Sequence, residues 1–135
     1  MMTLSPDLVR KIEEYCDSQH DSWLKLGEKL VRTFGYDRKT RRISTQVRNL
    51  QQTVVSATKF SDIEDFVKNQ MGRESQGNWG KVGDDVLEHL RKLRKASEEL
   101  DPDPARQFAI RLRLAWAWVR AVVSQYLYEI AQQQM

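Results

Sequence analysis

The chain of 135 residues has one cysteine, Cys16, and two histidines, His20 and His89. A single cysteine excludes a disulfide within the chain, which fits a reducing compartment. One cysteine and two histidines are too few for the usual ligand set of a zinc site. Cys16 follows an apolar stripe and is expected in the core, whereas His89 stands on a charged helix face. The sequence therefore predicts no metal site and no cofactor.

Strong breakers of regular structure are also scarce, with six glycines and three prolines. Long regular elements are expected from such a composition. Apolar residues make up 40% and charged residues 30%, which is ordinary for a globular protein and argues against disorder. The length suits one hydrophobic core. Residues 1–135 are expected to form a single domain.

A long uninterrupted hydrophobic run is missing as well. The most apolar stretch, residues 112–130, contains five charged or polar residues and is too polar to span a bilayer. Met1–Asp7 has neither the basic nor the apolar region of a signal peptide. We therefore expect a cytoplasmic protein without a membrane partner.

What the chain does have is helical periodicity. Residues 61–64 form a capping-box pattern, and a glycine-containing loop is expected over residues 72–83. Helices are expected to begin at Ser5-Pro6, Asp21 or Ser22, Ser44 or Thr45, Ser61, Asp84 and Pro104. The fold predicted is an all-α, single-domain bundle of about five to six helices with a long C-terminal helix.

That last helix, from Pro104 nearly to Met135, is apolar around more than half of its circumference. A helix packed on one side needs a stripe only somewhat wider than 100°. One interpretation is a central helix surrounded by the others. The other is a protein interface at Trp116 or Trp118, because tryptophan is favoured at such anchors.

The clearest binding signal is the basic connector formed by Arg38, Lys39, Arg41 and Arg42. It leads into a helix N-terminus, whose backbone N–H groups can receive phosphate oxygens. Gln46 and Arg48 follow in the first turn of that helix, where the amide of Gln46 could contact sugars or bases without a strict demand on sequence. A solvated charged loop is the alternative.

Catalytic patterns are absent from the sequence. The glycine-containing loop matches neither the Walker pattern nor a dinucleotide-binding fingerprint. Asp84 and Asp85 stand in an expected first helical turn, where acids favour the macrodipole. No Ser/His/Asp catalytic arrangement can be identified in the sequence. We therefore expect a protein that binds macromolecules and is not an enzyme.

Residues 43–50, Ile-Ser-Thr-Gln-Val-Arg-Asn-Leu, resemble a family signature. The signature Thr-Thr-Ser-(Gln/Lys)-(Ile/Leu)-Arg-Asn-(Leu/Phe) belongs to the small subunit of type III-A (Csm-like) CRISPR–Cas effector complexes. That family is all-helical and of similar length. Here Ser44-Thr45 stands for the family's Thr-Ser. Gly72-Arg73 follows as a Gly-Arg pair, although residues 66–71 before it depart from the usual aromatic and small-residue run.

The resemblance implies a non-catalytic subunit of a ribonucleoprotein complex in antiviral defence. Such a subunit would contact single-stranded RNA, both crRNA and target, without reading its sequence. It would pack against backbone subunits and the large subunit, and it would self-associate within the complex. By position in the motif, Arg48 and, less closely, Arg73 would contact RNA or a neighbouring subunit. The alternative function is a helical protein-interaction adaptor or regulator that binds no nucleic acid.

Overall fold

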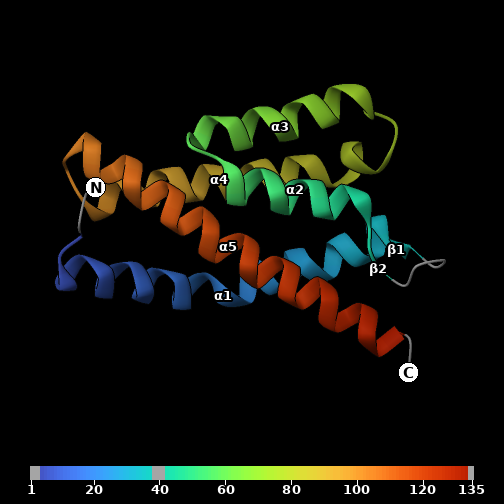
Figure 1. Cartoon of the computed structure of the whole chain (residues 1–135), viewed down its shortest axis with the longest axis horizontal. Coiled ribbons are helices and arrows are strands. Elements are labelled where there is room, and N and C mark those ends of the chain that lie inside the picture. Colours follow the sequence, from blue (N-terminus) through green and yellow to red (C-terminus); the bar gives the residue numbers. More distant parts are fainter. Residues whose placement is uncertain (1–3, 38–41, 134–135) are drawn as a thin grey trace.

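The computed structural model describes residues 4–37 and 42–133, and Figure 1 shows how its helices are arranged. The helices are α1 (Pro6–Phe34), α2 (Thr45–Ser56), α3 (Phe60–Arg73), α4 (Asn78–Leu100) and α5 (Pro104–Gln133). Two short strands, β1 (Tyr36–Asp37) and β2 (Arg42–Ile43), pair antiparallel between α1 and α2. The prediction of an all-α bundle with a long C-terminal helix is confirmed.

The longest helix, α5, is the element around which the others pack. It contacts each of the other four helices, and it runs diagonally across the molecule in Figure 1. Its buried residues are Ile110, Leu114, Ala115, Trp118, Val119, Val122, Val123, Tyr126 and Ile130. Contact with neighbours on several sides explains why the helix is apolar over so much of its circumference.

The N-terminal part of the chain forms one helix where the sequence suggested two. The predicted start at Asp21 or Ser22 is wrong, because α1 continues from Pro6 to Phe34. No glycine or proline interrupts residues 7–26, so nothing in this stretch forces a break. The start at Pro6 is as predicted, with the Ser5 side chain accepting from the Leu8 N–H at 3.2 Å.

Two other helix starts differ from the sequence prediction. α3 begins at Phe60 without a side-chain cap, so the predicted capping box at Ser61 does not form. α3 thus begins one residue earlier than predicted. Phe60, its first residue, is 2% exposed, and burial of this side chain favours the earlier start. α4 begins at Asn78, six residues before the predicted start at Asp84.

Two glycines of the predicted loop lie inside α4 and allow close packing. A Cβ at Gly80 would approach the Ser75 carbonyl oxygen to 2.0 Å, and one at Gly83 would approach the Met71 side chain to 2.3 Å. These glycines therefore serve the packing of α4 on the end of α3. Within the described part of the chain, no helix combines the length and apolarity needed to cross a membrane.

Candidate nucleic-acid interface

The side chain of Trp79 holds four helices together at one end of the bundle. It lies in the first turn of α4 and is fully buried. Its ring centroid is 5.2 Å from that of Phe34 in the last turn of α1 and 5.9 Å from that of Phe66 in α3. Its Nε1 donates to Oε1 of Gln46 in the first turn of α2, at 2.9 Å. These contacts fix the relative positions of the helix ends around it.

Tyr126 of α5 anchors both ends of the segment between α1 and α2. Its hydroxyl donates to the Gly35 carbonyl oxygen and accepts from the Ser44 N–H at 2.9 Å. Burial raises the pKa of Tyr126, and the Ser44 hydrogen bond opposes that rise. β1 and β2 pair in the register Tyr36 with Ile43 and Asp37 with Arg42. The basic connector therefore starts and ends at fixed points on the bundle.

Exposed cations from four helices gather at this same end. Arg32 lies in the last turn of α1, Arg48 in the first turn of α2, Arg73 at the end of α3 and Lys81 in the first turn of α4. All four side chains are exposed. None forms an ion pair with a residue that the structure describes. We call these four residues the basic end.

Figure 1 shows where the helix ends that carry the basic end lie. The C-terminal ends of α1 and α3 and the N-terminal ends of α2 and α4 lie on the right, next to β1 and β2. Neither α2 nor α4 carries an acid in its first turn, and the one acid beside the start of α4 is Glu74, whose carbonyl oxygen accepts from the Gly77 and Gly80 N–H groups. The electrostatic environment there favours an anion.

The structure places the predicted RNA-binding residues in three different ways. Arg38, Lys39 and Arg41 lie outside the described residues. The backbone of Arg42 belongs to β2, and its side chain is likewise not described. Gln46 is half-buried, and its amide oxygen is occupied by the Trp79 indole, so this side chain serves the core.

Arg48 and Arg73 are both exposed and belong to the basic end. Their two companions, Arg32 and Lys81, were not among the residues predicted from the sequence. Arg32 is a single cation that precedes the connector on another helix, and Lys81 is a single cation far away in the sequence. One basic residue at a helix end is a weak signal, and the packing around Trp79 brings these residues together.

The two tryptophans considered for a protein interface lie in opposite environments. Trp116 is 47% exposed, whereas Trp118 is fully buried. Nε1 of Trp118 donates to Nδ1 of His89 at 3.2 Å. His89 is half-buried rather than on the surface, and burial lowers its pKa, with Lys92 adding to the effect. Only Trp116 of this pair is at the surface of the isolated chain.

The described residues contain no group of three or more His, Cys, Asp or Glu side chains that could hold a metal ion. Comparison of the chain with family models, with curated proteins and with solved structures gives no match.

Proposed function

We propose that this protein binds single-stranded RNA through the basic end and the adjacent connector, as a non-catalytic subunit of a ribonucleoprotein. The observation that carries the proposal is the convergence of Arg32, Arg48, Arg73 and Lys81 from four helices beside one basic segment. Cations that are spread over helix ends, with no acid partner among the described residues, suit a flexible chain of phosphates.

The chemistry of this surface favours contacts to the backbone over reading of bases. Arginine and lysine bind phosphate without regard to sequence. The one amide of the predicted set that could have contacted a base, Gln46, is bonded to Trp79. The proposed binding is therefore independent of sequence and depends strongly on salt.

The motif in residues 43–50 supports a more specific proposal. On the resemblance to the small subunit of type III CRISPR–Cas complexes, the RNA would be crRNA and its target. The protein partners would be the backbone subunits and the large subunit of the effector complex, with further copies of this chain beside it. Arg48 belongs both to the motif and to the basic end, which links the resemblance to the surface.

Binding of labelled polyuridine, followed by fluorescence anisotropy over a range of salt concentrations, tests the proposal. The variant has Arg41, Arg42 and Arg48 replaced by alanine. We expect weaker binding and a slope of log affinity against log salt that is about 2 units shallower, for three lost phosphate contacts. Far-UV circular dichroism should be unchanged.

A matched variant removes three cations elsewhere on the molecule. Lys59 precedes α3, and Lys92 and Lys95 lie in the second half of α4. All three are exposed. Replacing them with alanine causes the same loss of net charge, and we expect RNA binding close to that of the parent. Equal weakening by both triple variants would mean that binding depends only on the net charge of the protein, which would contradict the assigned surface.

The exposed apolar residues of α5 favour the second candidate, a protein-interaction adaptor. Trp116, Leu127 and Tyr128 are each about half exposed. An adaptor of this kind would bind polyuridine no better than the triple variant does. The same titration therefore separates the two functions.

A further inference from the structure

A groove runs between α1 and α5, away from the basic end. It has a volume of about 640 Å³ and continues into a second hollow of about 360 Å³. The two hollows share Cys16, Asp17, Ala117 and Arg120. Together they extend from Ile12 to Leu24 along α1, which is roughly 18 Å of helix.

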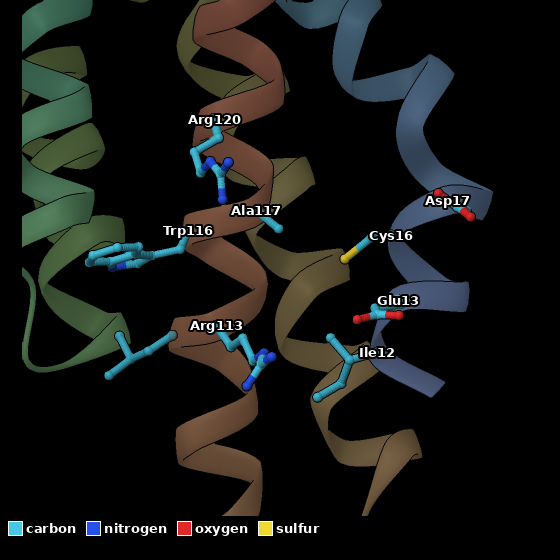
Figure 2. Close-up of a pocket in the computed structure, with 9 residues that line it drawn as sticks. Ile12, Glu13, Cys16, Asp17, Arg113, Trp116, Ala117 and Arg120 are labelled. Carbon is cyan, nitrogen blue, oxygen red and sulfur yellow. The ribbon is translucent and has the colours of Figure 1, made fainter. Parts of the chain in front are cut away.

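The groove exists because α1 and α5 touch closely at one point and separate on its N-terminal side. At the close point, a Cβ on Gly27 would lie 2.5 Å from the Val122 carbonyl oxygen. Figure 1 shows the two helices diverging from their crossing toward their N-terminal ends. Figure 2 looks into the groove, with Ile12 and Cys16 on one side and Ala117 on the other.

The two rims of the groove carry opposite charges. Glu13 and Asp17 line it from α1, whereas Arg113 and Arg120 line it from α5. All four are exposed. None of them forms an ion pair with any residue in the described ranges. The acids and the arginines thus face one groove without pairing across it.

Between the rims the surface is apolar. The half-buried side chains of Cys16 and Ala117 are small, which leaves room for side chains of a partner. Burial raises the pKa of the Cys16 thiol, with Asp17 adding to the rise, so the thiol stays uncharged in this setting. Trp116 extends from α5 on the side away from α1 (Figure 2) and is 47% exposed.

We propose that the α1/α5 groove binds one amphipathic helix of a partner protein. This helix carries lysine or arginine on the flank that meets α1 and glutamate or aspartate on the flank that meets α5, with an apolar stripe between them. A groove between two helices that is several turns long fits a third helix that packs in the same manner. The acidic rim disfavours RNA, so the groove and the basic end can be occupied at the same time.

The probe is a synthetic helical peptide with an alanine–leucine stripe, lysines on one flank and glutamates on the other. The control peptide has the same composition with both charges mixed on each flank. Exchanging the flanks would be a poor control, because a helix that docks in the reverse direction exchanges them again. We expect the segregated peptide to bind at least about tenfold more tightly. Equal binding of the two peptides would overturn the proposal.

Two variants of the protein sharpen the test. Glu13→Arg with Asp17→Arg makes both rims basic and should weaken the segregated peptide about tenfold. Adding Arg113→Glu and Arg120→Glu gives the two rims opposite charges again. Binding should then return, with the peptide docked in the opposite direction. The matched control, Asp65→Arg with Glu99→Arg, makes the same charge change at exposed positions that do not line the groove and should bind as the parent does. Undiminished binding to the first variant would refute the proposed site.

Sedimentation of the chain alone tests whether the groove is occupied by a second copy of the chain. We expect a monomer under conditions in which the peptide binds. A dimer that Glu13→Arg with Asp17→Arg dissociates would mean that the groove is filled by a second copy of this chain, and the proposal of a partner helix would fall. Loss of RNA binding in the variant of Arg41, Arg42 and Arg48 has no bearing on this result, so the two proposals fail independently.

Discussion

Gly27 of α1 lies directly against the backbone of Val122 in α5. A Cβ at position 27 would meet the Val122 carbonyl oxygen at 2.5 Å and Cβ of Gln125 at 2.9 Å. Backbone atoms cannot move aside as a flexible side chain can. The absence of a side chain at this single position therefore sets how closely the two long helices approach.

Gly27→Ala should destabilise the protein although alanine is the better helix former. The gain in helix propensity is about 1 kcal/mol, whereas forcing atoms into a packed contact costs about 1–3 kcal/mol and separates the helices. Gly72→Ala is the control, because a Cβ there meets nothing within 4 Å, so only the propensity gain remains. Urea denaturation should show a lower free energy of unfolding for the first variant and a higher one for the second. A more stable Gly27→Ala protein would contradict the close contact.

Tyr126→Phe should affect RNA binding without removing a charge. The change leaves the Gly35 carbonyl and the Ser44 N–H without their partner, which costs about 1–3 kcal/mol of stability. It also frees both ends of the basic connector, so we expect weaker binding of polyuridine. Tyr128→Phe alters a side chain that is 57% exposed and should change neither property. Unaltered RNA affinity in the folded Tyr126→Phe protein would show that the anchoring of the connector does not matter for binding.

His89 should make the stability depend on pH. Burial lowers its pKa in the folded protein below the usual value near 6.5. The unfolded chain therefore binds more protons as pH falls below about 6.5, and stability declines from that point down to the folded pKa. His89→Asn should flatten this part of the curve of unfolding free energy against pH. His20→Asn, at an exposed position, should leave the curve unchanged, and an equal effect of both variants would argue against the assignment to His89.

Arg32→Ala and Lys81→Ala test the part of the basic end that only the structure reveals. Each should weaken polyuridine binding to a similar extent whatever the RNA sequence, and each should reduce the salt slope by about 0.7. Lys95→Ala removes an exposed lysine of α4 that lies several turns from Lys81 and should leave the slope as it is. Normal slopes in both of the first two variants would restrict the interface to the connector, Arg48 and Arg73.

The sequence was most informative where local chemistry decides the backbone. Pro6 and Pro104 mark helix starts correctly, because proline suits the first helical turn and cannot continue a preceding helix. Gly80 and Gly83 were misleading, because the same residue permits a loop or a close contact within a helix. The start of α3 depends on the burial of Phe60, which is a property of the whole fold.

The candidate site was only partly accessible from the sequence for a similar reason. The connector and Arg48 are visible as a local cluster. Arg32 and Lys81 join them through the packing of Phe34 and Gln46 on Trp79, and no spacing along the chain encodes that. Whether Trp116 or Trp118 is exposed depends on how α5 is rotated about its own axis. Because α5 has apolar residues on most sides, its sequence pattern does not determine that rotation.

The pairing of α1 with α5 also has a consequence for how the protein is made. These helices meet at Gly27 and Val122, so nearly a hundred residues must be synthesised between the two halves of the contact. On the ribosome, the apolar face of α1 is already outside the tunnel while its partner is still untranslated. Contacts this distant in sequence slow folding and prolong the exposure of apolar surface. We therefore expect the nascent chain to depend on chaperones until α5 emerges, and to become protease-resistant only then.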